Sequence, residues 1–157
     1  MTKPDELAVD AWAALLRAHR LLVGEVEAAL KAANTIPLVS YDVLLELRRA
    51  GRPLRQRELE ERMLLAQYGV SRLIDRLEAD GFVERRPDPN DARARLIALT
   101  ATGRKALKAA WPVYSAAIES VVGEALSESE LAIARDVMRK LSAASESRRL
   151  HARARRV

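Results

Sequence analysis

Three patterns in the 157-residue sequence predict a mainly α-helical fold with one small antiparallel β-hairpin. Apolar residues recur at helical spacing over most of the chain. Two short segments rich in strand formers, FVERR and ARLIALT, flank the turn-forming residues PDPND. Gly51 and Gly81 each follow a helical pattern and suit a residue that ends a helix. The length fits one domain, so we expect three helices and a hairpin between two long helical ends.

The first helical pattern runs from Leu7 to about Ala33 without an internal proline. A helix of about 26 residues at ~1.5 Å per residue is roughly 39 Å long, more than the core of such a domain needs. We therefore expect this helix to pair with a second copy of the chain. Its periodic apolar residues are Leu7, Trp12, Leu15, Leu16, Leu22, Val26 and Leu30.

The middle of the chain contains three shorter helical patterns. Residues 40–50 (SYDVLLELRRA) predict a helix that ends at Gly51, and residues 55–63 (RQRELEERM) predict the next one. A third helix is expected from about Ala66 to Asp80, followed by Gly81 in a left-handed conformation. The hairpin comes directly after this third helix.

Two further helices are predicted after the hairpin. The first spans about residues 102–126 and should be kinked by Pro112. The second spans about residues 127–148, where Ser127 and Glu130 have the spacing of a capping box. The last residues, 149–157, are expected to form a disordered basic tail; the alternative is an extension that touches phosphates.

Positive charge is concentrated in two parts of the chain, although the net charge is only +5. Residues 48–105 contain 14 basic and 9 acidic side chains, and the last ten residues contain five arginines without an acid. The segments 1–47 and 106–147 are net acidic. This distribution favours a nucleic-acid-binding surface over a uniformly solubilising one.

Several function classes find little support in the composition. No apolar run approaches the roughly 20 residues that span a bilayer, and the N-terminus has no apolar signal core, so we expect a cytoplasmic protein without membrane contact. The absence of cysteine excludes thiol redox switches and cysteine metal sites, and two histidines give metal binding almost no support. Without a glycine-rich phosphate loop or a spaced cluster of histidines and acids, neither an enzyme nor a cofactor is expected.

The third helix of the middle region has the pattern of a recognition helix. Val70, Leu73, Ile74 and Leu77 fall on the side to be buried, which leaves polar side chains on the outward face. Arg72 is the first candidate for base contact, because a guanidinium can donate two hydrogen bonds to guanine. The alternative is a solvated face whose charges pair along the helix. The predicted DNA-binding residues of this helix are Gln67, Tyr68, Ser71, Arg72 and Arg76.

The hairpin carries arginines suited to the wing of a winged helix-turn-helix protein. Arg86, Arg93 and Arg95 are the candidates for DNA contact, and Asp88 and Asp91 are candidates to hold some of the hairpin arginines in place. Arg93 lies nearest the tip. A narrow minor groove has an enhanced negative potential, so an arginine there would add affinity and shape preference.

At the level of the whole chain, the sequence resembles the MarR family of bacterial transcription regulators. The resemblance rests on SYDVLLEL, on LLAQYGVSRLIDRLEADGFVERRPDPNDARARLIALTATGR and on the helical ends. It implies a homodimer that binds a palindromic double-stranded DNA operator, with repression relieved by a small phenolic or lipophilic ligand. Ser71 and Arg72 match the groove-reading start of the recognition helix, and Asp91 and Arg93 match the wing signature. Ala66 and Ala94 depart from the residues that relatives often have there.

The predicted organisation is one winged helix-turn-helix domain over residues 1–148. Its DNA-binding core covers about 36–100, and the helices of about 7–33 and 102–148 form a dimerisation layer. The alternatives to a ligand-controlled regulator are a winged-helix protein-interaction module and a DNA binder without ligand sensing. Candidates for a pocket that takes a small aromatic or lipophilic effector are Trp12, His19, Tyr41, Trp111 and Tyr114, although aromatic residues at helical spacing are more often core.

Overall fold

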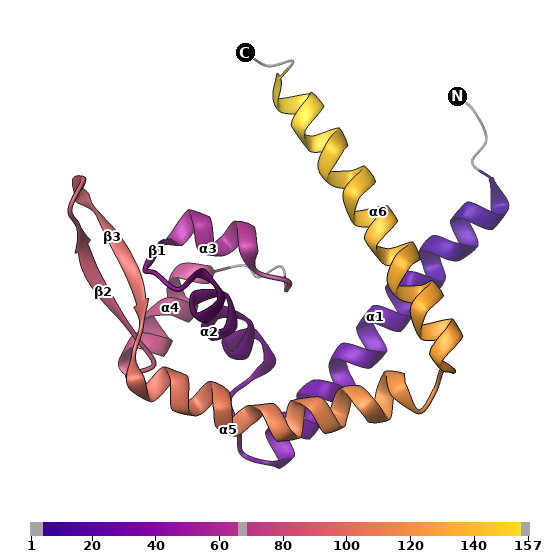
Figure 1. Ribbon diagram of the computed structural model, residues 1–157, viewed down its shortest axis with the longest axis horizontal. Helices are drawn as coiled ribbons and strands as arrows, with labels where there is room; N and C mark the ends of the chain where they lie inside the picture. The colour runs from indigo at the N-terminus through magenta and orange to yellow at the C-terminus, as the bar shows by residue number, and fades with distance from the viewer. Residues whose placement is uncertain (1–4, 66–68, 155–157) are drawn as a thin grey trace. The chain divides into compact units, whose positions relative to one another are not determined.

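The computed structural model describes residues 5–65 and 69–154, and it is mainly helical with one small sheet (Figure 1). The chain divides into two units, Met1–Ala117 and Ile118–Val157. None of the helices in the described ranges is long and apolar enough to cross a membrane. In chain order the elements are α1 (Glu6–Ala32), α2 (Leu38–Ala50), β1 (Leu54–Arg55), α3 (Gln56–Arg62), α4 (Val70–Ala79), β2 (Val83–Asp88), β3 (Asp91–Leu99), α5 (Ala101–Ile118), the π-helical η1 (Glu119–Gly123) and α6 (Glu128–Ala154).

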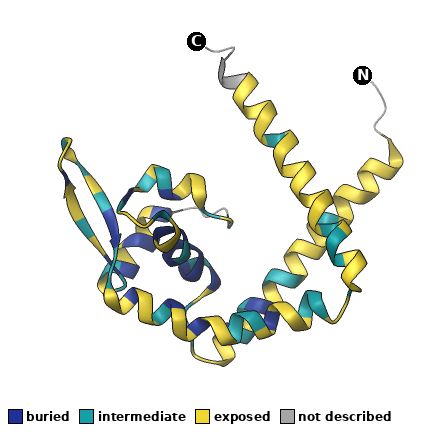
Figure 2. Cartoon of the chain, in the orientation of Figure 1, coloured by how far each residue is buried: buried dark blue, intermediate teal, exposed yellow. Residues whose placement is uncertain are grey.

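The hydrophobic core of the first unit lies between α2, α3, α4, the sheet and the first half of α5. We call these elements together the lobe. The dark blue residues of Figure 2 gather in these elements. The predicted buried face of α4 is confirmed, and each such aliphatic side chain stabilises the fold by about 1.5–3 kcal/mol. The core residues are Tyr41, Val43, Leu44, Leu47, Leu54, Leu59, Val70, Leu73, Ile74, Leu77, Val83, Ile97, Leu107 and Ala110.

The sheet has three strands in the order β1-β3-β2, one more than the predicted hairpin. Strand β1 pairs antiparallel with β3, with Leu54 opposite Ile97 and Arg55 opposite Leu96. A two-residue strand is too short to show alternating polarity, so side-chain periodicity could not reveal it. Its pairing attaches the outer edge of β3 to the link between α2 and α3.

The hairpin turn is shorter than the predicted PDPND loop. Strands β2 and β3 pair from Val83 opposite Leu99 to Pro87 opposite Arg95, and the next pair is Asp88 with Asp91. The turn itself is therefore limited to residues 89–90. Residues 92–94 are left without a partner in this ladder, and they form a bulge on β3 just below the tip.

The start of α4 differs from the sequence expectation of about Ala66. Gly69 has φ +76°, a left-handed conformation that cannot belong to an α-helix, and the helix begins at Val70. At the other end, Gly81 has φ +75° directly after the helix, as predicted. The later start places Ser71 and Arg72 in the first turn of α4.

The C-terminal helices follow the prediction in part. Helix α5 continues through Pro112 and ends at Ile118, where η1 replaces the expected α-helical continuation. The predicted capping box of α6 is confirmed, because the Ser127 N–H donates to Glu130 Oε2 at 2.9 Å and the Glu130 N–H donates to Ser127 Oγ at 3.4 Å.

Helix α6 also corrects the expected disordered tail, since it continues to Ala154 and therefore includes residues 149–154. This part of the tail contains neither proline nor glycine, so extending a capped helix through it costs little free energy.

The long helices α1 and α6 expose many of their apolar side chains. Figure 2 shows the ribbons of both helices largely in yellow, the colour of exposed residues. In α1, Trp12 is 60% exposed. In α6, Leu141 is 52% exposed. Isolated exposed apolar residues are common, but stripes of them at helical spacing are typical of surfaces that another chain covers. The exposed large apolar residues of these two helices are Leu7, Val9, Trp12, Leu16, Leu21, Ile133, Val137, Met138, Leu141 and Leu150.

Candidate nucleic-acid interface

The first turn of α4 presents two of the predicted DNA-binding side chains to solvent. Ser71 and Arg72 are the second and third residues of the helix, and both are exposed. The Arg72 guanidinium has no hydrogen bond or ion pair with any residue that the structure describes. It is therefore available to an external acceptor such as a base edge or a phosphate. Gln67 and Tyr68, also predicted to contact DNA, lie outside the described residues.

The outward charges of α4 do not pair with one another within the described structure. Asp75 Oδ1 accepts a hydrogen bond from Arg85 Nη2 of β2 at 2.5 Å, so the acid is bound to the hairpin. Arg76 lies one turn after Arg72 and lines a hollow of about 570 Å³ beside the end of α1 and the middle of α5. The alternative of a face neutralised along the helix therefore does not describe Asp75.

Arg85 joins strand β2 of the predicted wing to α4, the predicted recognition helix. Its side chain contacts Glu78 as well as Asp75, and its backbone N–H donates to Glu78 Oε1 at 2.9 Å. Sequence reasoning placed Arg85 beside the hairpin without a defined partner. The structure shows that this arginine joins β2 to α4, so the helix and the wing keep one relative position.

Asp88 is held by an arginine from outside the hairpin. Arg55 of β1 donates to Asp88 Oδ2 from Nε at 2.8 Å and from Nη2 at 2.5 Å. The Asp88 side chain is 5% exposed, and the Asn90 N–H donates to Oδ1 at 2.9 Å. The Asn90 N–H and then the Arg55 guanidinium lower the pKa of Asp88. The sequence predicts the hairpin arginines as partners of this acid; Arg55 was missed because strand β1 was missed.

Asp91 shapes the bulge below the tip of the wing. Its Oδ1 accepts a hydrogen bond from the Arg93 N–H at 3.0 Å, and its Oδ2 lies 3.9 Å from Arg55 Nη2. Two carboxylates of the wing, Asp88 and Asp91, thus share the arginine of β1. The wing is fixed both at its tip by these contacts and at its side by Arg85.

The three predicted wing arginines occupy different surroundings. Arg93 lies in the bulge, and within the described parts of the chain its side chain has no partner. Arg95 Nη1 donates to the carbonyl of Ala94 at 3.2 Å. Arg86 lies midway along β2, bonds Glu84 from Nε at 2.7 Å and lines a hollow at the base of the hairpin. Arg93 is therefore the wing arginine most available for contact with DNA.

The structure brings together three of the five predicted pocket residues. The rings of Tyr41 and Tyr114 meet edge to face at 4.7 Å, and those of Trp111 and Tyr114 at 6.1 Å. Burial raises the pKa of both tyrosines. Trp12 and His19 are exposed on α1 and make no ring contact with this group in the described chain. Tyr41 belongs to the hydrophobic core, as the alternative interpretation of these aromatics expected.

A buried carboxylate that contacts the segment after α3 was not singled out from the sequence. Asp42 of α2 is 4% exposed, and its Oδ2 accepts a hydrogen bond from the Leu65 N–H at 2.9 Å. Its Oδ1 has no hydrogen-bond partner among the described atoms. Burial raises the pKa of Asp42. An acid within the apolar motif SYDVLLEL was the signal that could have identified it.

Sequence comparisons place relatives of this chain among transcription regulators. A family model described as MarR family matches residues 35–94. An uncharacterised HTH-type transcriptional regulator of Bacillus cereus is 36% identical over 110 residues, which cover 70% of this chain and 72% of that protein. Transcriptional regulator HosA of Escherichia coli O111:H- is 33% identical over 88 residues, which cover 56% of this chain and 64% of HosA.

Solved structures share the same fold. Sco3205, a MarR family transcriptional regulator from Streptomyces coelicolor determined in complex with DNA, matches with a TM-score of 0.78 and 25% identity over 90% of this chain and 89% of that one. BpsR of Bordetella bronchiseptica, whose DNA binding is regulated by 6-hydroxynicotinic acid, matches with a TM-score of 0.77 and 24% identity over 89% of this chain and 98% of that one. The predicted winged helix-turn-helix fold is confirmed.

Proposed function

Because this chain belongs to the MarR family of DNA-binding transcription regulators, we propose that it is a repressor that binds a palindromic operator as a homodimer. One observation carries the proposal: Arg72 and Arg93 are exposed and lack partners among the described residues, while Arg85 joins the two elements that carry them. A regulator needs such side chains free for DNA and held in a defined arrangement.

The two arginines are assigned different tasks. Arg72, in the first turn of α4, reads a guanine edge in the major groove, and a bidentate contact of this kind discriminates by about 1–3 kcal/mol. Arg93, in the bulge of the wing, enters the neighbouring minor groove and responds to its width. Ser71 contacts a phosphate of the DNA backbone beside Arg72. The candidates Arg86 and Arg95 contribute at most long-range electrostatic attraction to the DNA.

The homodimer is supported by the exposed apolar side chains of α1 and α6. Stripes such as Val9, Trp12 and Leu16 in α1 are expensive to leave in water and are suited to a second copy of the chain. A two-fold dimer requires operator half-sites about one helical turn apart, roughly 34–36 Å. We place this activity on DNA in the cytoplasm.

Release by a small aromatic or lipophilic ligand is the last part of the proposal. The aromatic group of Tyr41, Trp111 and Tyr114 joins α2 to α5. A ligand bound there would act between the lobe and the second half of α5. BpsR, a relative in fold, has its DNA binding regulated by 6-hydroxynicotinic acid. The alternatives are a DNA binder without ligand sensing and a winged-helix protein-interaction module.

Selection of bound duplexes from a random DNA pool at about 150 mM salt tests the proposal. We expect an enriched palindrome, and then three variants are measured on it. Arg72→Ala should relax preference at one base pair, and Arg93→Ala should weaken binding to all sequences and reduce the salt slope by about one. Lys108→Ala, which removes an exposed charge from α5, serves as the control and should bind as wild type.

Two results would contradict the proposal. A pool without enrichment, combined with binding that disappears as salt rises, would favour the protein-interaction module or a nonspecific DNA coat. An Arg72→Ala protein that ranks operator variants as wild type does would show that α4 does not read bases through this residue.

A further inference from the structure

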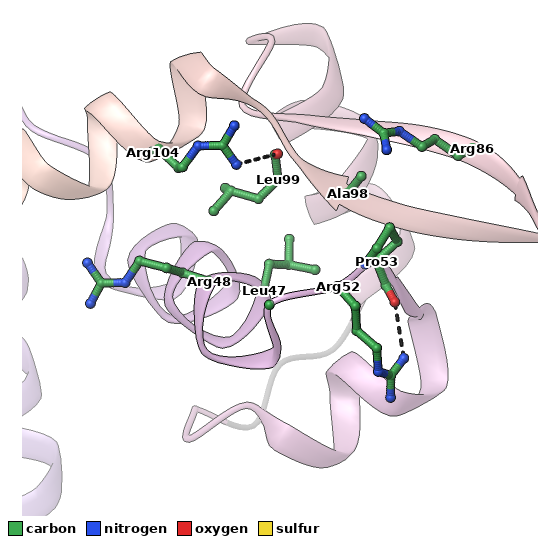
Figure 3. Close-up of a pocket in the computed structure, with 9 residues that line it drawn as sticks. Leu47, Arg48, Arg52, Pro53, Arg86, Ala98, Leu99 and Arg104 are labelled. Atoms are coloured by element: carbon green, nitrogen blue, oxygen red, sulfur yellow. Dashed lines mark hydrogen bonds between the residues drawn. The ribbon is translucent and has the colours of Figure 1, made fainter.

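We propose that a hollow at the base of the wing is a binding site for a small organic carboxylate with a compact apolar body. The hollow has a volume of about 330 Å³ and lies between the end of α2, the link to β1, strands β2 and β3, and the first turn of α5. This volume falls at the lower end of the ~300–1,000 Å³ typical of small-molecule sites. Figure 3 shows the side chains that line it.

Four arginines from four different segments surround the hollow. Arg48 comes from α2, Arg52 from the link to β1, Arg86 from β2 and Arg104 from α5. In Figure 3 their stems stand around a central group of shorter side chains, while the guanidinium groups of Arg48 and Arg52 point away from that group. Sequence positions 48 and 104 are far apart, so only the fold collects these charges. No carboxylate is among the described residues that line the hollow.

The arginines differ in how far their charges are neutralised. Arg52 Nη2 lies 2.7 Å from Glu58 Oε1, and this contact together with a hydrogen bond from the Arg55 N–H lowers the pKa of Glu58 to about 2. Arg86 is paired with Glu84. Arg104 donates from Nη1 to the neutral carbonyl of Leu99 at 3.2 Å, and the Arg48 guanidinium has no hydrogen bond or ion pair in the described chain. Arg48 and Arg104 therefore remain without a carboxylate partner among the described residues.

The floor of the hollow has an apolar part, which decides the class of ligand. Pro53 and Leu99 are half-buried and form this part above the buried Leu47 and Ala98. An inorganic anion would leave Pro53 and Leu99 uncovered, whereas an organic acid can cover them with its hydrocarbon part. Its carboxylate then meets the guanidinium fork of Arg104, or that of Arg48 once this exposed side chain has turned toward the hollow, and either fork can give two parallel hydrogen bonds.

Arg72 and Arg93, the two proposed DNA contacts, do not line this site, and Arg86 is the wing candidate that it shares. A carboxylate shared by Arg48 and Arg104 would join α2 to α5 at the base of the hairpin. The presence of the site does not depend on the repressor proposal, and it can be tested without DNA.

The test is a titration of the full chain, followed through the Nε–Hε NMR signals of its arginine side chains. Cyclohexanecarboxylate is the probe, cyclohexanecarboxamide is its neutral counterpart, and inorganic phosphate is the anion without an apolar part. We expect saturable shifts of the Arg48 and Arg104 signals with the carboxylate alone. The variants Arg48→Gln and Arg104→Gln should each weaken binding by about tenfold, as for the loss of a charge-assisted hydrogen bond.

Lys105→Gln is the matched control, since it removes a charge next to Arg104 but does not line the hollow. Its affinity should stay within about twofold of wild type. If Arg104→Gln fails to fold, Arg48→Gln decides, because Arg48 is exposed and has no hydrogen bond or ion pair to lose within the described residues. Equal shifts with phosphate or with the amide, shifts of Arg93 as large as those of Arg104, or no saturation up to about 10 mM would each overturn the proposal.

Discussion

The lobe and helix α1 differ in how far their apolar side chains are buried. In the lobe, Leu44, Leu59 and Ile74 are completely buried by neighbours from the same chain. In α1, only Val26 and Leu30 at the C-terminal end are buried, and Trp12 is 60% exposed. Helix α6, taken by itself, has a similar exposed stripe with Ile133 and Leu141.

This contrast separates two sources of stability. The lobe derives its stability from contacts within one chain, so that stability should not depend on protein concentration. The apolar stripes of α1 and α6 contribute only when another surface covers them, so their contribution should rise with concentration if a second copy is that surface. Three predictions test this contrast, and a fourth compares two charged groups within the lobe.

The largest effect is expected in the centre of the lobe. Ile74→Ala removes a fully buried side chain of α4 and leaves a cavity, which should lower the free energy of unfolding by about 2–5 kcal/mol. Urea denaturation followed by circular dichroism measures the change. A loss that varied strongly with protein concentration would contradict the independence of the lobe.

The next effect concerns association through the long helices. Leu141→Glu places a charge on the apolar stripe of α6, and we expect it to weaken the proposed dimer by about 100-fold or more, since an unpaired charge would be buried. Ser142→Glu introduces the same charge at the next, exposed position and serves as the control. Sedimentation velocity over a range of concentrations distinguishes the two. Equal behaviour of both variants would exclude this stripe from the interface.

Two glycines extend the contrast to the backbone. A Cβ at Gly103 of α5 would lie 2.1 Å from the Phe82 carbonyl oxygen, so Gly103→Ala should destabilise the lobe by about 1–3 kcal/mol. A Cβ at Gly24 of α1 meets nothing within 4 Å. Gly24→Ala should therefore stabilise the helix by roughly 0.5–1 kcal/mol. Thermal unfolding of both variants gives the signs, and a destabilising Gly24→Ala would indicate a surface packed closely against α1.

The smallest effects come from two carboxylates of the lobe with opposite pKa shifts. Burial raises the pKa of Asp42 above its usual 3.8, so its contribution to stability is complete below that value and is lost as pH rises through the folded pKa. Asp88 has a lowered pKa, so its contribution is present above 3.8 and is lost as pH falls through the folded pKa. Carboxyl ¹³C shifts recorded from pH 2 to 7 should show Asp42 protonating before Asp88 as the pH falls.

Side-chain periodicity predicted those parts of the fold that depend on a single helix. The buried face of α4 follows from the positions of Leu73, Ile74 and Leu77, and the α6 capping box follows from two residues three apart. The start of α4 was misplaced because a left-handed Gly69 interrupts a segment whose composition is compatible with helix. A disordered tail was expected over residues 149–157 because this segment is a charged chain end, whereas α6 continues to Ala154.

The sequence predicted the exposed arginines of the candidate site. It did not predict the ion pairs that join segments far apart in the chain. Arg72 and Arg93 were identified because a helical wheel and a turn locate them. Arg55 and its bond to Asp88 could not be, because they are 33 positions apart and meet through the unforeseen strand β1. For the same reason the arginines around the hollow at the base of the wing showed no sequence pattern.

The bulge of residues 92–94 is a place where the sequence can gain or lose residues during evolution. Below it the ladder from Val83 to Pro87 is fixed by five successive pairs, and above it the tip is held by Asp88 and Arg55. Residues could be inserted or deleted between these two anchors without shifting the register of the sheet below. The reach of Arg93 is therefore a property that evolution or an engineer can adjust in small steps, while the rest of the lobe is left intact.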